Sequence, residues 1–410
     1  MGKPKIRFEG YSEDWEQRKF GEITELKSAS RVHKDEWTSN GVPFYRSSDV
    51  MAAINGTENE KAFISEELYE KLSKVSGKLE EGDILVTGGG SVGNPYIVPD
   101  NKPLYTKDAD LLWIKNKGKF HSYFLYEFFF SPTFRNYLGS ISHVGTIAHY
   151  TITQLSDTPI CLPSFEEQKK VGEYFQSLDN LITLHQRKCD ETKTLKKYML
   201  QKMFPQNGEK VPEIRFDGFT EDWEQRKLGD ISSLITKGTT PKDKSGTGEV
   251  NFIKVENIND FSGDIVGMSK ISLEEHQGYL KRSQLQEGDI LFSIAGTLGR
   301  VTSVNKAILP ANTNQALSII RLKEGNLEYV KTCLKGNVVA DFIRRNPTIG
   351  AQPNLSLEQV SNLEIGIPSE AEQEKIGLYF SNLDHLITLH QRKCDELRSV
   401  KKFMLQNMFI

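Results

Sequence analysis

Few groups of residues in this sequence have types and spacings that could carry out chemistry. Gly88, Gly90 and Gly93 have the G-x-G-x-x-G spacing with which nucleotide-binding proteins hold a pyrophosphate. That use requires a helix to begin at the glycines, whereas the following residues 94–98 (NPYIV) favour a strand. A related stretch at 292–304 keeps only two of the glycines. The pattern therefore indicates a tight turn, where the backbone bends sharply or lies close to a partner's backbone.

The tripeptide Asn94-Pro95-Tyr96 is similar to part of the Asn-Pro-Pro-Tyr motif with which amino-methyltransferases hold a flipped base. One proline is missing, the related later stretch has 300–302 (RVT) at this place, and no cofactor-binding glycine loop comes before it. The sequence also lacks the P-loop, H-E-x-x-H and G-x-S-x-G motifs, and it has no clustered carboxylates with metal-ligand spacing. We therefore expect a chain without catalysis of its own.

Two His/Cys pairs, His185 with Cys189 and His390 with Cys394, each have the spacing that places both side chains on one face of a helix. Four such ligands could hold zinc if the two helices met there. The alternative, which we favour, is a polar layer that fixes the register of the helices, so that no metal is bound. His185 and His390 are the midpoints of the repeated segments 166–204 and 371–409, and the midpoints of an antiparallel pair lie together.

The elements that carry these residues are duplicated. The nonapeptide LITLHQRKC occurs at 181–189 and again at 386–394, and the surrounding segments 166–204 and 371–409 match at 26 of 39 positions. A second block, 4–23, is repeated at 212–231 and includes an identical DWEQRK. The chain is therefore two copies of one unit. We expect Trp15 and Trp223 to anchor the opening segment of each copy on its own core.

Two longer regions, 24–163 and 232–368, are alike mainly in pattern. Both contain EGDIL followed by a glycine-rich stretch, and both end at a proline-containing exit, CLPS and GIPS. Short β-rich runs separated by Gly, Asn and Pro dominate them, and amphipathic helices are expected at His121–Leu138 and Leu327–Arg345. We predict an α+β fold with two similar mixed α/β domains.

The repeated segments 166–204 and 371–409 are predicted to be long helices. Apolar residues recur at steps of three and four in a single stripe, which is typical of a coiled coil. Pro163 and Ser164 begin the first helix, Glu167 would complete a capping box, and Pro205 and Gly208 end it. Each stripe needs a partner, and the sister helix is the obvious one. We predict an antiparallel, pseudo-two-fold helix pair.

These patterns divide the chain into a first domain with its lead-in (1–163), a first helix (164–205), a linker with the second domain (206–368) and a second helix (369–410). The helix residues expected to form the pair or to dock partners are Phe175, Leu178, Leu181, Ile182, His185, Phe380, Leu383, Leu386, Ile387 and His390.

The composition limits the class of protein. No uncharged apolar run is long enough for a membrane span, and the N-terminus has no apolar region of the kind that secretion signals carry. The four cysteines are scattered, which fits a reduced, cytoplasmic setting. The net charge of −3 argues against a protein that wraps nucleic acid by itself, because such proteins are usually basic.

Polar side chains on the predicted loops of the two regions are candidates for recognition. Arg and Lys suit guanine edges, Asn and Gln suit adenine, and Glu can accept from cytosine. Any one of these side chains could instead be an ordinary solvated loop residue, but as a set they occupy equivalent places with different identities. They are Arg46, Ser47, Thr87, Ser91, Asn94, Thr146 and His149 in the first region, and Lys254, Glu256, Asn257, Thr297, Arg300, Asn312, Asn314, Gln352 and Asn354 in the second.

The whole chain resembles the specificity (S) subunit of type I restriction–modification systems, the HsdS family. The resemblance is carried by the PxIRFxGxxxDWEQRK openings, the paired EGDIL and glycine-turn segments, the GxxxxxS/TxxQ segments before the exits, and the EQxKxGxYFxxLDxLITLHQRKC helices. It implies two target recognition domains that each read half of a bipartite site in double-stranded DNA, held apart by antiparallel helices that dock two methyltransferase (M) subunits.

The resemblance also implies cofactors and further partners. The M subunits would bind S-adenosylmethionine and methylate adenine, and restriction (R) subunits would use ATP and Mg²⁺ for translocation and cleavage. This chain would hold no cofactor. Two other functions remain open from the residues alone: a symmetric adaptor that does not bind DNA, and an enzyme with a nucleotide site at the 88–93 glycines.

Overall fold

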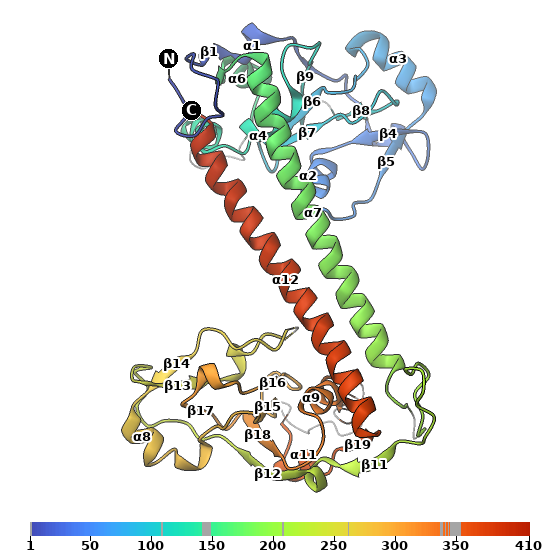
Figure 1. Cartoon of the computed structure of the whole chain (residues 1–410). Coiled ribbons are helices and arrows are strands. Elements are labelled where there is room, and N and C mark those ends of the chain that lie inside the picture. Colours follow the sequence, from blue (N-terminus) through green and yellow to red (C-terminus); the bar gives the residue numbers. More distant parts are fainter. Residues whose placement is uncertain are drawn as a thin grey trace. The chain divides into compact units, whose positions relative to one another are not determined.

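The structure is a computed structural model that describes residues 2–107, 110–141, 149–206, 209–260, 262–336, 339, 340, 342, 344 and 354–410. The chain forms two compact units (Figure 1). Unit 1 comprises Met1–Leu184 and Cys394–Ile410, and unit 2 comprises His185–Lys393. Two long helices, α7 (Phe165–Lys202) and α12 (Glu370–Met408), contribute one part to each unit. No described helix is long and apolar enough to cross a membrane.

Unit 1 has a mixed α/β core built on two four-stranded sheets. One has the order β2 (Leu26–Ser28), β9 (Leu111–Ile114), β6 (Ile84–Thr87), β7 (Pro95–Ile97), and all its neighbours are antiparallel. The other has the order β3 (Trp37–Thr38), β5 (Ala62–Ile64), β4 (Val42–Tyr45), β8 (Tyr105–Thr106). A strand pair, β1 (Glu16–Lys19) with β10 (Pro159–Leu162), joins the opening segment to the proline exit. The helices are α1 (Phe20–Ile23), α2 (Ser47–Asn55), α3 (Glu66–Ser76), α4 (Ser122–Phe128), α5 (Pro132–Ile141) and α6 (Ile152–Asp157), with a 3₁₀ turn η1 (Lys34–Glu36).

Unit 2 repeats this plan. Its four-stranded antiparallel sheet has the order β12 (Ser232–Lys237), β18 (Leu317–Leu322), β15 (Ile290–Ser293), β16 (Val301–Ser303). Beside it lie a three-stranded sheet of β14 (Ser269–Ile271), β13 (Val250–Ile253) and β17 (Ala311–Thr313), and the pair β11 (Glu224–Lys227) with β19 (Glu364–Ile367). The described helices are α8 (Leu273–Gln277), α9 (Leu327–Lys335) and α11 (Leu357–Ser361), with 3₁₀ turns η2 (Leu228–Ile231), η3 (Val255–Asn257), η4 (Lys281–Ser283) and η5 (Lys306–Ile308). The duplicated α+β fold is therefore confirmed.

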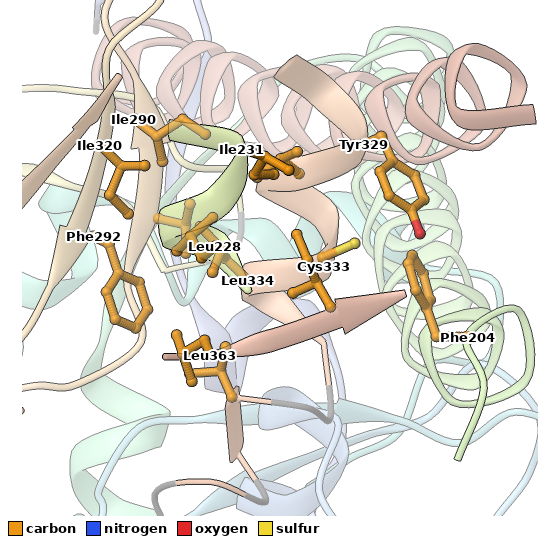
Figure 2. Close-up of a cluster of buried hydrophobic side chains, with 14 of the residues drawn as sticks. Phe204, Leu228, Ile231, Ile290, Phe292, Ile320, Tyr329, Cys333, Leu334 and Leu363 are labelled. Carbon is orange, nitrogen blue, oxygen red and sulfur yellow. The ribbon is translucent and has the colours of Figure 1, made fainter. Parts of the chain in front are cut away.

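Each unit has its own hydrophobic core, with the repeated tryptophan inside it. Trp15 and Trp223 are both 1% exposed, which confirms them as anchors of the opening segments. In unit 2, side chains from η2, β15, β18 and α9 meet in one cluster, and Phe204 joins it just after α7 (Figure 2). Because Phe204 lies in that cluster, the end of the long helix is fixed to the domain of unit 2.

A buried ion pair fastens the opening segment of each unit to its long helix. In unit 1, Arg7 donates from Nε and Nη2 to the two carboxylate oxygens of Glu167, each at 2.7 Å. In unit 2, Arg215 makes the same two contacts to Glu372, at 2.7 and 2.8 Å. The two repeated sequence blocks therefore bind each other within each unit, which gives a physical reason for their similarity.

Three details of the predicted helices were wrong or incomplete. The helix expected at His121–Leu138 is two helices, α4 and α5, and Pro132 begins the second, where its missing N–H costs nothing. α9 ends at Lys335 with Gly336 at its C-cap. In the predicted remainder to Arg345, the described residues 339, 340, 342 and 344 are helical, and 337, 338, 341, 343 and 345 lie outside the described residues, as does Gly208. Ser164 accepts from the Glu167 N–H at 3.4 Å, but the Glu167 carboxylate binds Arg7 and does not complete a capping box.

The two long helices run antiparallel within each unit. In unit 2, His185 Nδ1 lies 3.0 Å from His390 Nδ1, and the Cys189 thiol points to the carbonyl of Ile387 at 3.8 Å. In unit 1, the Cys394 thiol points to the carbonyl of Ile182 at 3.6 Å, so the two thiol contacts are equivalent under the repeat. The prediction that His185 and His390 lie together on antiparallel helices is confirmed.

Candidate nucleic-acid interface

In unit 2, one edge of the four-stranded sheet gathers the loops that carry most of the candidate residues. Because neighbouring strands are antiparallel, the carboxyl ends of β12 and β15 and the amino ends of β18 and β16 meet at this edge. The loops that leave it are 238–240, 294–300 and 314–316. We call these three loops, together with residues 254–256 and Asn354, the unit 2 loop edge.

Backbone hydrogen bonds tie these loops to one another. Ile294 N–H donates to Ala316 C=O at 2.9 Å, and Leu355 N–H donates to Ile294 C=O at 2.8 Å. Asn354 pairs with Ala295 in an isolated β-bridge. Thr239 N–H donates to Thr313 C=O at 2.9 Å. The side chains of Thr297, Asn314 and Asn354 therefore stand on a fixed backbone frame.

Arg300 fastens the η3 turn to the same edge. Its Nη1 donates to the carbonyls of Val255 and Ile258, both at 3.0 Å, and its Nε lies 2.7 Å from the Asp260 carboxylate. This places Lys254 and Glu256 beside the loops of the sheet edge. Arg300 itself is mostly committed to these contacts, so we assign it a positioning role.

The equivalent edge of unit 1 gathers its candidates in the same way. Gly88 N–H donates to Asp110 C=O, and Tyr150 N–H donates to Gly88 C=O, both at 2.8 Å. Ser47 Oγ donates to Asp110 C=O at 3.0 Å, and Lys107 N–H donates to Tyr45 C=O at 2.8 Å. The unit 1 loop edge therefore consists of 46–47, 88–94, 107, 110 and 149.

The glycine-rich stretches at the two edges are tight turns, as predicted. Thr87 and Ser293 occupy equivalent places: the hydroxyl of each accepts the N–H seven residues on, at 2.9 and 2.7 Å, and donates back to a carbonyl within the turn. Gly93 has φ +75°, and a Cβ there would meet Phe134 and Leu138 at 2.9 Å. β7 follows the turn and no helix begins there, which removes the geometry of a dinucleotide site.

Three candidate side chains are buried, and their hydrogen-bonding groups are satisfied inside their own units. Thr87 braces the turn, and the Asn257 amide donates to the carbonyls of Val266 and Gly267 while accepting from Lys254 N–H. The Asn312 amide donates to Leu280 C=O and Ser283 Oγ, and its oxygen faces His276. We withdraw these three as contacts to a partner, because a buried polar group that loses its hydrogen bonds is costly.

The other candidates differ in exposure and in whether their side chains already have partners within the chain. Arg46 is held by Asp49 at 2.9 Å and stacks over Trp37, so it is committed within unit 1. The Asn94 side-chain oxygen accepts from Arg135 at 3.0 Å. The Ser47 hydroxyl, at the same edge, donates to Asp110 C=O. Thr146 and Gln352 lie outside the described residues. Lys254 and Asn314 are half-buried; Lys254 pairs with Glu256 at 3.7 Å, and Asn314 Oδ1 accepts from Ala316 N–H at 3.2 Å. The candidates with exposed side chains at a loop edge are Ser91, His149, Glu256, Thr297 and Asn354.

Sequence reasoning missed further polar residues at these edges. Thr240 Oγ1 donates to the side-chain oxygen of Gln315, and both are exposed at the unit 2 loop edge. In unit 1, Lys107 and Asp110 form an ion pair beside Gly89. Thr240 follows β12 and Gln315 precedes β18, but the sequence did not distinguish these two polar residues from other loop residues.

The predicted helix-pair residues divide into two groups. Phe175, Leu178, Phe380, Leu383 and Ile387 are buried, and Ile182 packs against the unit 1 core. Leu181 and Leu386 point outward and are 43% and 40% exposed, so a role in the seam between the helices is wrong for these two. As outward apolar side chains on a charged helix, they fit the other predicted role, docking of a partner.

The His185–His390 contact has the character of a polar layer. The two rings lie with centroids 5.2 Å apart, and burial, followed by the proximity of His185, lowers the pKa of His390. Cys189 and Cys394 point to carbonyls, as described above. Within the part of the chain that the structure describes, no group of three or more His, Cys, Asp or Glu residues could hold a metal ion. The zinc alternative therefore has no support.

Each unit has a lysine–aspartate ion pair between the two long helices. A third charged residue joins each pair, a glutamate in unit 1 and a lysine in unit 2. In unit 1, Lys401 Nζ binds Asp179 at 2.7 Å and Glu127 at 2.8 Å. In unit 2, Asp384 binds Lys196 and, at 3.3 Å, Lys335. Burial raises the pKa of Glu127, although Lys401 opposes this, and burial lowers the pKa of Lys335. Unit 1 thus has an excess carboxyl here, and unit 2 an excess amine.

Comparison with known proteins identifies the family. Residues 12–194 and 220–399 each match the family model described as "Type I restriction modification DNA specificity domain". The chain is 22% identical over 413 residues to the type I restriction enzyme MjaVIII specificity subunit of Methanocaldococcus jannaschii, covering 95% of this chain and 91% of that protein. It is 26% identical over 276 residues to the type I restriction enzyme EcoBI specificity subunit of Escherichia coli, covering 60% and 56%.

The extent of these matches varies. In three of the curated relatives the chain spans only 40%, 46% and 56% of their length. Among solved structures, the type I restriction–modification S subunit from M. genitalium matches with a TM-score of 0.63 at 14% identity, covering 100% of this chain and 99% of that one, which supports the fold. Because the family model matches both halves, this chain belongs to the type I restriction–modification DNA specificity subunit family.

Proposed function

We propose that this chain recognises DNA sequence for a type I restriction–modification complex, with each unit reading one half of a bipartite site. The observation that carries the proposal is the repeated loop edge, where one backbone frame presents different polar side chains in the two units. Side chains such as Lys254, Glu256 and Asn314 have the hydrogen-bonding groups that distinguish base edges in the major groove. A shared frame with different side chains suits two readers of different sequences.

We also infer that the helix pair sets the separation of the two half-sites, at roughly one turn of DNA or about 10 bp. The outward-facing Leu181, Leu386 and Leu389 would dock two methyltransferase subunits, because exposed apolar side chains on a charged surface are typical of interface cores. S-adenosylmethionine would bind to those subunits, and ATP with Mg²⁺ to restriction subunits. This chain would supply recognition and no catalysis.

Exchange of one domain tests the two-reader proposal. When residues 232–368 are replaced by the equivalent region of another family member, only one half of the methylated site is expected to change. Replacement of 24–163 should change only the other half. The measurement is methylome sequencing of a host that expresses each exchanged chain with its methyltransferase subunits. A change in both halves, or in neither, would contradict the proposal, and an unchanged methylome without the gene would favour the adaptor function.

Two neighbouring asparagines should separate recognition from stability. Asn312→Ala removes a fully buried amide and is expected to cost about 1–3 kcal/mol of stability without altering the methylated sequence. Asn314→Ala, at the unit 2 loop edge, removes one hydrogen bond, from Ala316 N–H at 3.2 Å, and should cost less stability, about 1 kcal/mol. It should also relax the preference for one base pair, by the roughly 1–3 kcal/mol of discrimination that a bidentate contact provides. Thermal unfolding and methylome sequencing of both variants provide the check; reversed outcomes would place the reader elsewhere.

A further inference from the structure

Unit 2 carries a strip of exposed cations beside its loop edge. The strip consists of Lys237, Lys242, Lys244, Tyr279, Lys281 and Arg282, and all six side chains are exposed. Among the described residues, no carboxylate lies within ion-pair distance of its five cationic side chains. We call it the basic strip. None of its members was a candidate from the sequence, because they lie on two separate segments.

Four acidic residues, Asp243, Glu249, Glu274 and Glu275, are interspersed with the strip; Glu275 is half-buried and the other three are exposed. Glu275 accepts from the backbone N–H groups of Lys242 and Asp243 at 2.6 and 3.3 Å, and Glu249 accepts from Leu273 N–H at 3.2 Å. Asp243 accepts from the backbone and the hydroxyl of Ser245, which lower its pKa. The exposed Glu274 on α8 makes no such contact with another described residue. The segments 237–249 and 273–282 thus carry five cations and four carboxylates, an excess of one positive charge. Because three of the carboxylates accept hydrogen bonds from N–H or O–H groups of the chain, they are held locally, whereas the cationic side chains stay available to a phosphate.

An aromatic ring lies within the strip. Tyr279 is 52% exposed, and Lys242 Nζ lies 4.6 Å from the centre of its ring. This contact holds the Lys242 segment against the turn that leads into Lys281 and Arg282. Exposed rings among cations are typical of nucleic-acid surfaces, where the hydroxyl of a tyrosine can also bind a phosphate oxygen.

The strip continues directly from the unit 2 loop edge. Gly238 N–H donates to Leu317 C=O at 3.2 Å, so the chain leaves β12 at the edge and reaches Lys242 a few residues later. On the other segment, Leu280 C=O accepts from Asn312 on β17 at 2.9 Å, which fixes Tyr279 and Lys281 beside the three-stranded sheet near α8 (Figure 1). A duplex seated on the loop edge would therefore pass its backbone over the strip.

Unit 1 uses the corresponding stretch differently. There α3 carries three exposed glutamates, and Lys78 is bound by Glu70 at 2.8 Å. Lys102 and Lys107 are also held, by Asp100 and Asp110. Lys71 and Lys74 on α3 are exposed, but the three glutamates outnumber them, so the helix has a net negative charge. The two units therefore differ in charge at this place, because the strip of unit 2 has a net positive charge.

We propose that the basic strip binds the DNA phosphates that flank the half-site read by unit 2, and that unit 2 provides more of the sequence-independent attraction than unit 1. The inference rests on the proposed function. Phosphate contacts add affinity through the release of counterions and carry no base preference. The slightly acidic chain would thereby concentrate its positive charge where the DNA backbone lies.

Matched double variants test the strip in the full chain assembled with methyltransferase subunits. Lys281→Ala with Arg282→Ala removes two charges from the strip. Lys306→Ala with Lys323→Ala removes two from the opposite edge of the same sheet, since these residues follow β16 and β18. The strip variant is expected to weaken binding to target and non-target duplexes alike, on the order of 10-fold at about 0.1 M salt, and to lower the salt slope by about 2. The control should change neither quantity.

Several outcomes would contradict phosphate binding by the basic strip without contradicting the proposed function. An unchanged salt slope, or an equal loss in the control, would show that no phosphate is bound there. Loss of methyltransferase assembly with normal DNA binding by the assembled fraction would assign the strip to an acidic protein surface. Thermal unfolding of each variant excludes misfolding as the cause. Failure of the domain exchange to move one half-site would instead refute the two-reader proposal, whatever the salt slope.

Discussion

Replacing Glu372 by alanine is expected to destabilise unit 2 by about 3–5 kcal/mol, the cost of breaking a buried ion pair by removing one partner. The Glu372 side chain is fully buried, and Arg215 is 11% exposed. Without the carboxylate, Arg215 would remain in a low-dielectric site with its two strongest hydrogen bonds lost. The opening segment of unit 2 should then be held less firmly to α12, because its ion pair with that helix is lost while ring contacts such as Phe216 with Tyr379 remain.

Hydrogen exchange read by mass spectrometry can assign the loss to unit 2, since a chain with two units need not unfold in one step. Peptides from 212–231 and from the start of α12 should lose protection. Glu374→Ala, which removes an exposed charge two residues away, is the matched control and should have little effect. Glu167→Ala should do the same to unit 1, with the added loss of the Trp15 Nε1 contact at 3.4 Å. Unchanged protection in both variants would refute a structural role for the pair.

Lys401→Met is expected to destabilise unit 1 by about 3–5 kcal/mol at alkaline pH, because it leaves the buried carboxyl of Glu127 without its cation. The pKa of Glu127 is already raised in the folded state, chiefly by burial. Between the ordinary glutamate range and that raised pKa, the native state binds more protons than the unfolded state, so stability falls as pH rises. The variant should therefore be nearer to wild type at about pH 5 than at about pH 8.

A double-variant cycle separates the charge effect from lost packing. Glu127→Gln should restore much of the stability of Lys401→Met at about pH 8 and remove its pH dependence, since the amide carries no charge to desolvate. The exposed neighbour variant Lys402→Met serves as the control. Equal losses at both pH values, with no rescue, would mean that Lys401 acts through packing alone. Unit 2 should show the opposite trend from Lys335, whose lowered pKa makes stability rise with pH through the range below the ordinary lysine pKa.

Much of the fold could be predicted because internal repeats and the local periodicity of apolar residues indicate it. Identical LITLHQRKC segments on one apolar stripe predict two helices whose midpoints meet, and the His185–His390 contact follows from that symmetry. The glycine turns could be predicted as well, because a strand after Gly93 excludes the helix that a pyrophosphate site requires. Pro132, which begins α5 and so divides the single predicted helix His121–Leu138, was visible in the sequence but was outweighed by the apolar pattern around it.

The candidate site was only partly predictable. From the sequence alone, Asn257, Asn312 and Asn314 cannot be distinguished, because all three are asparagines near the ends of short strands. Two are buried and bonded to carbonyls from other segments, while the third stands at the loop edge. The basic strip was missed for the same reason, because Lys242 and Tyr279 come together only when the chain folds back. Whether a polar group is free or committed depends on which distant backbone reaches it.

By itself, the sequence determined that the chain is duplicated, that each copy is an α+β domain with a long helix, and that the helices pair. These features depend on periodicity and on identity between copies, which need no knowledge of distant contacts. Only the tertiary structure decided that Arg7 and Arg215 bind Glu167 and Glu372, that Leu181 and Leu386 face outward, and which polar residues remain free. Those outcomes depend on burial and on partners far apart in the chain, because the free energy of a polar group is set by its surroundings and not by its neighbours in sequence.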